Sequence, residues 1–397
     1  MSKLKNSPAA VDELLTRGVA EVINAEHLRQ RLLAGRPLRI KLGIDPTSPN
    51  IHLGRAVVLW KLRAFQELGH KVIFIVGDFT GVIGDTSDKE AERPMLTEAE
   101  IKRNLKTYFR QALTILDPKQ TETRYNSSWL KKLNFHEIGK LADLFGLHEF
   151  ESRELISKRL QAGKRVSLRE LLYPLMQGYD SVAIKADVEI GGTDQKFNLL
   201  AGRTIQPAYG QPAQDILTMT LMEGTDGRKM SSSWGNVINL TDSAGEMVGK
   251  VMSLPDQLLG KYFLLATRLP LEEIGRLPAA MPNPRDQKLH LAENIAALYH
   301  GPAAAAKARA GFIAQFSNGE LPAQIPLQKL PGGSYQLVEL LAQTGLAASK
   351  SEARRLLQQG GVKLNGKVAV QDQPVSLAAE PLLLQVGKRK FLKLQKR

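Results

Sequence analysis

The chain has 397 residues and a mass of 43.8 kDa, enough to bury a large core and to form two or three domains. Its 43% hydrophobic content is typical of a globular protein, and the absence of cysteine excludes disulfides and thiolate metal sites. The net charge of +14 favours a polyanionic partner.

The seven histidines show no metal-ligand spacing, so we expect no protein-bound metal. The start of the chain lacks the apolar core of a signal peptide, and no apolar run reaches the length of a membrane-spanning helix. These features predict a cytoplasmic protein with no membrane partner.

The first part of the chain predicts alternating helices and strands. Residues 11–34 have the spacing of an amphipathic helix, with Leu14, Leu15, Val19, Val22 and Ile23 on one side. Residues 38–44 predict a strand, and residues 57–69 predict a helix. Residues 71–79 predict a buried strand that runs into a glycine-rich loop at 80–88.

The same alternation continues downstream. Helical patterns cover 97–116 and 167–181, and residues 186–192 predict a strand that ends in two glycines. A helix over 196–205 follows, and 242–316 has a mostly helical pattern. We therefore predict an α/β fold, a Rossmann-like doubly wound parallel sheet, whose ligands bind beyond the carboxyl ends of the strands.

The stretch HLGR stands where the first predicted parallel strand gives way to a helix. Backbone N–H groups at a helix start attract phosphate, and Gly54 allows a nucleotide to approach the backbone closely. His52 has a hydrogen-bond donor for a phosphoryl oxygen. The structural alternative is a histidine packed near a helix cap.

The second polar stretch is GRKMSSSWGN, residues 227–236, which has neither helix nor strand pattern. A mobile loop of this kind can close on a triphosphate and bring Lys229 to charge that develops in a transition state. By itself, such a loop is more often simply solvated.

Taken together and in this order, HLG and KMSSS resemble the HIGH and KMSKS motifs of class I aminoacyl-tRNA synthetases. The segments LLYPLMQGYD (171–180), IGGTDQKFN (190–198) and GDFTGVIGDTSDKEAER (77–93) resemble the tyrosyl-tRNA synthetase family. The resemblance implies that ATP activates tyrosine to an adenylate and that tyrosine then passes to tRNA(Tyr). It also implies Mg²⁺ carried by the ATP phosphates rather than by a protein cage.

The family's site residues carry over by position. For tyrosine the resemblance implies Asp180 at the phenol hydroxyl, with Asp85, Tyr173, Gln177, Gln195 and Lys41 around the rest of the substrate. For ATP it implies Gly43, Asp45, Gly54, Arg55, Gly191, Gly192, Asp194, Met230, Ser231 and Ser232, with Thr47, His52, Lys89, Arg93 and Lys229 as catalytic residues. Structural alternatives stay open: a helix-terminal carboxylate for Asp180, an Asx-turn for Asp85, packing for Tyr173 and Gln177, and a helix cap for Asp194 and Gln195.

Three positions depart from the family pattern. Arg55 replaces the second histidine of HIGH, and Ser232 replaces the second lysine of KMSKS. Lys41 stands where many relatives have a second tyrosine that binds the phenol. Lys41 could pair with Asp180 or reach solvent, and the sequence does not decide between them.

The C-terminal region has its own character. Residues 317–333 are rich in proline and glycine and predict a linker. Residues 334–397 carry 11 Lys and Arg against 4 Asp and Glu, half of the net charge. The pattern over 334–369 resembles the S4 RNA-binding module, a small α+β domain, with Lys350, Arg354 and Arg355 on one helix face for phosphate contact.

We therefore predict a catalytic domain over 1–241, an α-helical anticodon-binding domain over 242–316, and the S4-like domain after the linker. Asp256 is a candidate contact to a guanine in the anticodon. The resemblance also implies a homodimer. Two alternatives remain: a tryptophanyl-tRNA synthetase, and a synthetase-like RNA-binding protein without catalytic activity.

Overall fold

The computed structural model describes residues 6–46, 48–85, 97–317, 325–387 and 390–397. The chain forms two compact units, Met1–Ala306 and Lys307–Arg397. In the part of the chain that is described, no helix is long and apolar enough to cross a membrane.

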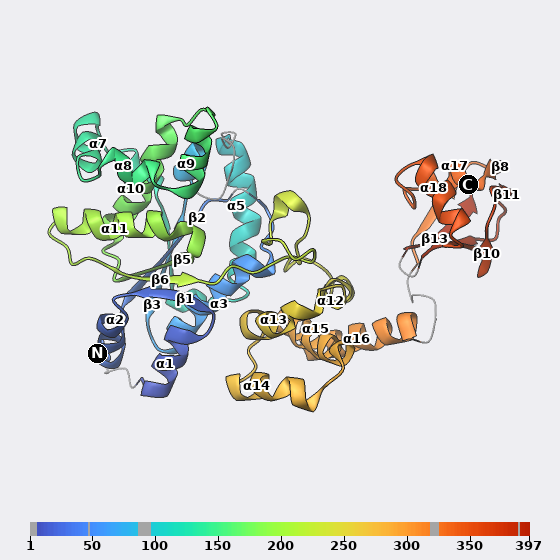
Figure 1. The fold of residues 1–397 in the computed structure, drawn as a ribbon, viewed down its shortest axis with the longest axis horizontal. Helices are drawn as coiled ribbons and strands as arrows, with labels where there is room; N and C mark the ends of the chain where they lie inside the picture. The colour runs from blue at the N-terminus through green and yellow to red at the C-terminus, as the bar shows by residue number, and fades with distance from the viewer. Residues whose placement is uncertain (1–5, 47, 86–96, 318–324, 388–389) are drawn as a thin grey trace. The chain divides into compact units, whose positions relative to one another are not determined.

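A six-stranded sheet forms the centre of the first unit (Figure 1). Its strands are β1 (Val19–Ile23), β2 (Arg39–Ile44), β3 (Lys71–Val76), β4 (Thr121–Tyr125), β5 (Val188–Gly192) and β6 (Asp215–Met219). The order is β1-β6-β5-β2-β3-β4, and only the edge pair β1–β6 is antiparallel. The predicted parallel sheet is thus confirmed, with an antiparallel strand added at one edge.

Helices cover both faces of this sheet, with α10 and α11 on one side and α3 on the other (Figure 1). The helices of this unit are α1 (Pro8–Thr16), α2 (Ala25–Leu33), α3 (Leu53–Glu67), α4 (Thr80–Ile83), α5 (Glu98–Ala112), α6 (Ser127–Leu130), α7 (Phe135–Ala142), α8 (Leu147–Glu151), α9 (Glu154–Gln161), α10 (Leu168–Ile184), α11 (Lys196–Ala208), α12 (Ala244–Met252), α13 (Leu259–Ala266), α14 (Leu271–Ala280) and α15 (Pro284–His300). The helix α16 (Pro302–Ser317) follows. These bounds confirm the predicted helices over 57–69, 97–116, 167–181 and 196–205, and the helical character of 242–316.

The prediction of one amphipathic helix over 11–34 is wrong. The chain forms α1, then β1, then α2, with breaks at Gly18 (φ 67°) and Asn24 (φ 61°). Residues Val19–Ile23 pair with β6, so a partner almost 200 residues away decides their conformation. Tertiary pairing overrides the local pattern here.

The strand order reverses between β2 and β5. The connection from β2 leads to β3 on one side, while the connection from β5 leads to β6 on the other. The carboxyl ends of β2 and β5 therefore form the crevice in which doubly wound folds bind their ligands. The polar and glycine-rich segments singled out in the sequence follow these two strands.

Close packing of α10 on α11 supports this crevice. A Cβ at Gly178 would lie 3.0 Å from the Ala201 carbonyl carbon and 2.6 Å from Ile205 Cδ1. Because one of these neighbours is backbone, a side chain at this position would push the helices apart. Glycine is what allows α10 and α11 to approach to this distance.

The second unit has a sheet of order β10-β9-β12-β13-β7 and a two-stranded ribbon, β11-β8. Its elements are β7 (Leu327–Leu330), β8 (Ser334–Gln336), α17 (Leu337–Gln343), α18 (Lys350–Gln358), β9 (Val362–Leu364), β10 (Lys367–Ala369), β11 (Pro374–Ser376), β12 (Leu382–Val386) and β13 (Lys390–Lys396). The helix pair and the strand-turn after it are as predicted. However, β7 lies within the predicted linker and pairs with β13, while the boundaries at 241 and 316 stay predictions.

The packing of α10 on α11 gives a stability prediction. Gly178→Ala is expected to lower the free energy of unfolding by about 1–3 kcal/mol, because the added methyl group meets backbone. The matched control is Gly249→Ala in α12, where a Cβ has nothing within 4 Å and stability should rise by about 0.5–1 kcal/mol. Urea unfolding of both variants measures this; an equal response of the two would contradict the packing argument.

Candidate functional site

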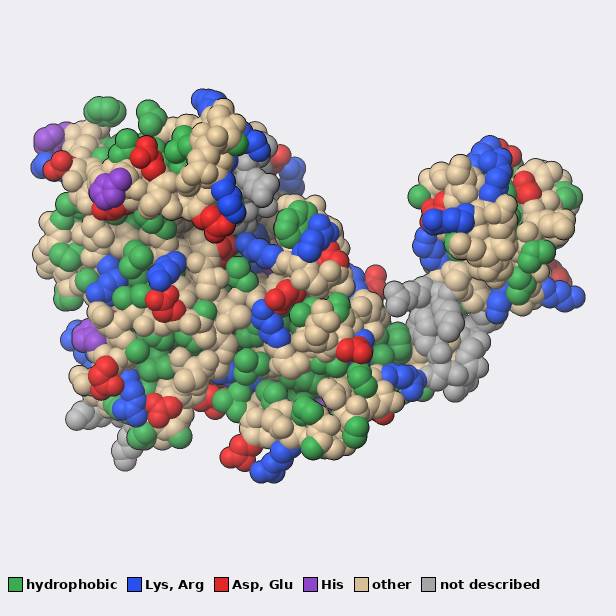
Figure 2. All heavy atoms as spheres, in the orientation of Figure 1, with side chains coloured by type: hydrophobic (Ala, Val, Ile, Leu, Met, Phe, Trp, Pro, Cys, Tyr) green, Lys and Arg blue, Asp and Glu red, His purple; other side chains and the backbone are tan. Residues whose placement is uncertain are grey.

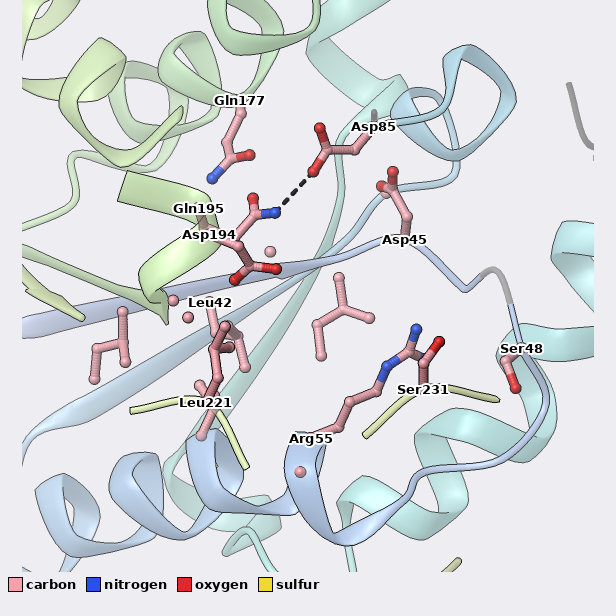
Figure 3. Close-up of a pocket in the computed structure, with 18 of the residues that line it drawn as sticks. Leu42, Asp45, Ser48, Arg55, Asp85, Gln177, Asp194, Gln195, Leu221 and Ser231 are labelled. Atoms are coloured by element: carbon pink, nitrogen blue, oxygen red, sulfur yellow. Dashed lines mark hydrogen bonds between the residues drawn. The ribbon is translucent and has the colours of Figure 1, made fainter. Parts of the chain in front are cut away.

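A cavity of about 920 Å³ lies at the carboxyl ends of β2 and β5 (Figure 3). Its lining comes from these strands, from the start of α3, from α10 and from the segment around 229–234. The predicted site residues that line it are Gly43, Asp45, His52, Gly54, Arg55, Asp85, Tyr173, Gln177, Asp180, Gly191, Gly192, Asp194, Gln195, Lys229, Met230, Ser231 and Ser232. Residues far apart in sequence thus meet around one space.

The remaining predicted residues lie elsewhere. Lys41 is fully buried beneath the cavity. Thr47, Lys89 and Arg93 lie outside the described residues. Asp256 pairs with Lys288 away from the cavity, and Lys350, Arg354 and Arg355 belong to the second unit.

Asp180 is a buried carboxylate that lines the cavity, with 3% of its surface exposed. Its Oδ1 accepts a hydrogen bond from Trp129 Nε1 at 2.7 Å, and its Oδ2 accepts one from Asn126 Nδ2 at 3.3 Å. Burial raises the pKa of Asp180 to about 7, although Lys41, Trp129 and Asn126 act in the opposite direction. The carboxylate keeps lone pairs for one more donor from the cavity.

Lys41 takes neither of the two roles left open by the sequence. Its ammonium lies 2.8 Å from Glu189 Oε1, so its ion pair is with Glu189 rather than Asp180. Both side chains are at most 1% exposed. Solvent is therefore excluded from this pair.

Besides Asp180, a set of hydrogen-bond acceptors lines the cavity. Tyr173 donates its hydroxyl proton to Asp45 Oδ2 at 2.9 Å, which leaves the oxygen lone pairs of Tyr173 available. Gln195 Nε2 donates to Asp85 Oδ2 at 2.8 Å (Figure 3). Gln177 also lines the cavity.

His52 precedes α3 as its N-cap residue and is buried. Burial, together with the nearby cations Arg55 and Lys229, lowers the pKa of His52 to about 3. The ring is therefore neutral at physiological pH. Its Nδ1 accepts from the Arg55 backbone N–H at 3.4 Å, so the proton resides on Nε2, which can donate to a ligand.

The first amides of α3 have partners within the chain. Leu53 N–H donates to the Ile238 carbonyl at 2.9 Å, and Gly54 N–H donates to Met230 Sδ at 3.3 Å. A phosphate at this helix start would therefore have to displace partners that these amides already have. Since a thioether sulfur is a weak acceptor, the Gly54 amide is the one that a stronger acceptor can capture.

The segment that contains Lys229 lies against β5. Lys229 Nζ forms an ion pair with Asp194 Oδ2 at 2.9 Å. A Cβ at Gly192 would lie 2.4 Å from Asp194 Oδ1, so glycine is needed for the carboxylate to fold back over the strand end. Both residues of this pair line the cavity.

Sequence reasoning missed several residues that shape the site. Thr80, Asn126 and Trp129 connect Asp45 to Asp180, because Thr80 donates to Asp45 at 2.7 Å and accepts from Asn126 at 2.9 Å. The one available signal was the Asn-Ser-Ser-Trp that follows β4. Strand β4 itself was not predicted, since TETRY has little apolar content.

The described residues contain no group of three or more His, Asp or Glu side chains that could hold a metal ion.

Comparison with known sequences places these features in context. The family model for tRNA synthetases class I (W and Y) matches residues 33–317, and the S4 domain model matches residues 337–377. Tyrosine--tRNA ligase from Moorella thermoacetica is 47% identical over 99% of this chain and 97% of its own length. The enzyme of the same name from Thermotoga maritima is 46% identical over 98% of each chain.

Solved structures show the same fold. Tyrosyl-tRNA synthetase from Archaeoglobus fulgidus, in complex with L-tyrosine, has a TM-score of 0.61 and 22% identity over 76% of this chain and all of its own. The C-terminally truncated mitochondrial tyrosyl-tRNA synthetase of Aspergillus nidulans has a TM-score of 0.64 and 21% identity over 77% and 94% of the two chains.

The raised pKa of Asp180 gives a prediction for stability against pH. Between its ordinary value of 3.8 and about 7, the folded state holds a proton that the unfolded state has lost. The free energy of unfolding therefore falls as pH rises, by about 1.4 kcal/mol per pH unit, and levels off above the folded pKa. In the Asp180→Asn variant the side chain does not titrate, so the free energy of unfolding lacks this dependence on pH.

The measurement is urea unfolding of the wild type and Asp180→Asn at several pH values between about 4.5 and 8. The variant should gain stability relative to the wild type as pH rises from about 4.5 to about 7, by a total of about 3 kcal/mol. A difference that does not change with pH would contradict the assigned burial of this carboxylate.

Proposed function

The chain belongs to the class I tRNA synthetases of the tryptophan and tyrosine group, and we propose that it is a tyrosine–tRNA ligase. It activates tyrosine with ATP to tyrosyl-adenylate and pyrophosphate, and then transfers tyrosine to the terminal ribose of tRNA(Tyr). The observation that carries tyrosine as the substrate is Asp180, a buried carboxylate with an unused acceptor at the cavity. A phenol supplies the missing donor, whereas phenylalanine leaves the carboxylate unpaired.

The α-ammonium group of the substrate has three N–H donors, and the cavity provides three acceptors for them. These are the Asp85 carboxylate, the Tyr173 hydroxyl oxygen and the Gln177 amide oxygen. Asp45 takes the proton of Tyr173, which keeps this hydroxyl an acceptor. Tyrosine then spans the distance between this acceptor set and Asp180.

ATP occupies the other end of the cavity in this proposal. Asp194 accepts from the ribose hydroxyls, and Gly43, where a Cβ would have nothing within 4 Å, leaves space for the nucleotide. Gly191 and Gly192 also line this end of the cavity and let Gln195 and Asp194 approach the strand end. Lys229 leaves Asp194 for the phosphates, and the Gly54 amide exchanges Met230 for a phosphoryl oxygen. The phosphates are also contacted by the Nε2–H of His52 and by the side chains of Arg55, Ser231, Ser232, Thr47, Lys89 and Arg93.

The chemistry needs no covalent nucleophile from the protein. The tyrosine carboxylate attacks the α-phosphorus, and pyrophosphate departs with both electrons of the broken bond. Catalysis then consists of holding the reactants in line and of stabilising the negative charge that grows on the departing phosphates. We propose that Mg²⁺ enters with ATP and is held by its phosphates.

The second unit provides an RNA-binding surface in this proposal. Lys350 is the first residue of the short helix α18, and Arg354 and Arg355 follow within it; all three are exposed. Lys and Arg side chains gather on the face of this unit that is visible in Figure 2. We expect these cations to contact tRNA phosphates, as fits the match of this region to the S4 domain. The guanine contact of Asp256 stays a prediction. The cytoplasmic location also stays a prediction.

We also propose that the protein is a homodimer, because large hydrophobic side chains are exposed in one segment. Phe135, Leu147 and Leu168 are 89%, 61% and 77% exposed at the starts of α7, α8 and α10. Hydrophobic side chains protrude at the end of the unit where α7 and α8 lie (Figures 1 and 2). A second copy of the chain would cover such a surface.

The function is tested by amino-acid-dependent ATP–pyrophosphate exchange with tyrosine, phenylalanine and tryptophan. We expect exchange with tyrosine alone. Asp180→Asn should lower kcat/KM for tyrosine by about 10- to 100-fold, since a hydrogen bond to a charged group is lost, and should leave the low value for phenylalanine unchanged. Exchange with tryptophan would point to the other specificity of the family, and no exchange in folded, RNA-binding protein would point to a binder without activity.

The role of Lys229 gives a kinetic prediction. Lys229→Ala should lower kcat for exchange by about 10²–10³-fold with little change in the KM for tyrosine, because the cation acts on charge that develops in the transition state. Lys261→Ala is the control: this lysine pairs with Glu223 outside the cavity and should keep the wild-type kcat. Equal kcat values for the two variants would remove Lys229 from the mechanism.

The dimer proposal predicts a change in mass. Phe135→Asp should convert the dimer to a monomer in light scattering after size-exclusion chromatography, because a charge would be buried in the contact. Leu271→Asp, on the exposed part of α14, should leave the dimer intact. A monomeric wild type, or a dimeric Phe135→Asp variant, would contradict the proposed contact.

A further inference from the structure

Lys41 and Glu189 occupy directly opposed positions on β2 and β5, the two strands between which the strand order reverses. Their side chains lie on the same face of the sheet and form an ion pair of 2.8 Å beneath the cavity. An ion pair with no access to water is costly to bury unless its remaining hydrogen-bonding capacity is satisfied. The remaining hydrogen-bonding groups of Lys41 and Glu189 all have partners, and these contacts determine how the cavity residue Gln177 is oriented.

The Lys41 ammonium has no donor left for a ligand. Its three N–H groups match three acceptors: Glu189 Oε1, the backbone carbonyl oxygen of Gln177 at 2.6 Å and Ser181 Oγ at 2.7 Å. Lys41 is also absent from the residues that line the cavity. It therefore does not replace the phenol-binding tyrosine that many relatives have at this position.

Glu189 completes the connection to Gln177. Its Oε1 accepts from Gln177 Nε2 at 3.1 Å, and its Oε2 accepts from Ser181 Oγ at 3.1 Å and from Gln214 Nε2 at 2.5 Å. A carboxylate paired with an ammonium can only accept. The nitrogen of the Gln177 amide must therefore face Glu189, and its oxygen must face the other way.

Figure 3 shows the result: the Gln177 amide oxygen lies on the side of Asp85, and the nitrogen lies on the opposite side. The backbone of Gln177 is held by Lys41 at the same time. The buried pair thus fixes both ends of this residue.

We propose that the Lys41–Glu189 pair is a positioning device for Gln177, which presents an acceptor rather than a donor to the substrate ammonium. This inference rests on the proposed function, because it concerns how the amino-acid site recognises an α-ammonium group. With the amide reversed, two N–H donors would face the positive charge. Recognition of the ammonium then depends on two residues that never touch the substrate.

The test compares two ligands that differ only in the ammonium: tyrosine and 3-(4-hydroxyphenyl)propanoate. The double variant Lys41→Met/Glu189→Gln keeps the site neutral and the side chains similar in size. Its new amide can either donate or accept, so Gln177 is no longer held in one orientation. We expect the Kd for tyrosine to rise by about 10- to 100-fold and the Kd for the propanoate to stay near the wild-type value.

The matched control removes another buried ion pair of the same unit. Arg159 and Glu170 are 3% and 0% exposed and lie 2.6 Å apart, but neither lines the cavity. Arg159→Met/Glu170→Gln should leave the ratio of the two dissociation constants unchanged. Equal weakening of both ligands by the Lys41/Glu189 variant would mean that the pair only supports the fold, and would overturn the proposal.

A second variant keeps the test decisive if the double variant does not fold. Glu189→Asp retains a paired, acceptor-only carboxylate but withdraws it from Gln177 by one methylene. The Kd for tyrosine should rise by about 3- to 10-fold without a change for the propanoate; unchanged binding of both ligands would overturn the proposal. A wild type that does not prefer tyrosine to the propanoate would overturn the proposed function instead.

Discussion

Burying charge beneath a ligand cavity is the constraint on which the rest of this structure depends. Asp180 lines the cavity and the Lys41–Glu189 pair lies beneath it, and all three side chains have almost no exposed surface. An isolated charge in such a place would be strongly destabilising. The chain offsets the cost by matching two of the charges across β2 and β5 and by surrounding the third with donors from Trp129 and Asn126.

The fold supplies the geometry that this arrangement needs. Parallel strands place Lys41 and Glu189 in register, and the reversal of strand order opens the crevice directly beyond them. Helix α10 then contributes Tyr173, Gln177 and Asp180 from one face. Because glycine lets α10 pack tightly on α11, this face is held rigidly over the strand ends.

The end of the cavity that we propose for the nucleotide is built differently. Its groups pair with one another in the structure, as Lys229 does with Asp194 and the Gly54 amide does with Met230. A ligand must replace these contacts, so binding exchanges internal partners for external ones. Rigid positioning at the end proposed for the amino acid and replaceable contacts at the end proposed for the nucleotide suit a reaction that relies on orientation and on charge stabilisation.

Much of this could be predicted from local sequence. The apolar runs of β2, β3 and β5 and the glycines after them pointed to a doubly wound sheet, and motif resemblance identified most of the residues around the cavity. The failures involve distant partners. Strand β1 exists because β6 pairs with it, and no local pattern reveals this. The role of Lys41 depends on Glu189, which lies in register on another strand far along the chain.

The same reason explains why Asn126 and Trp129 were missed. They follow a short polar strand, and their importance comes only from Asp180, which they reach in the folded chain. Buried polar networks are assembled from many parts of a sequence, so their members are identified by geometry rather than by spacing.

The most direct measurement of the central claim is proton release on tyrosine binding, obtained by calorimetry in buffers of different ionisation enthalpy. Free Asp180 has a pKa raised to about 7 by burial, and a phenol donor favours its ionised form. The account predicts release of close to one proton per site at about pH 6, little release above about pH 8, and none in Asp180→Asn. No proton release by the wild type at the lower pH would contradict the assignment of this buried carboxylate as the group that recognises tyrosine.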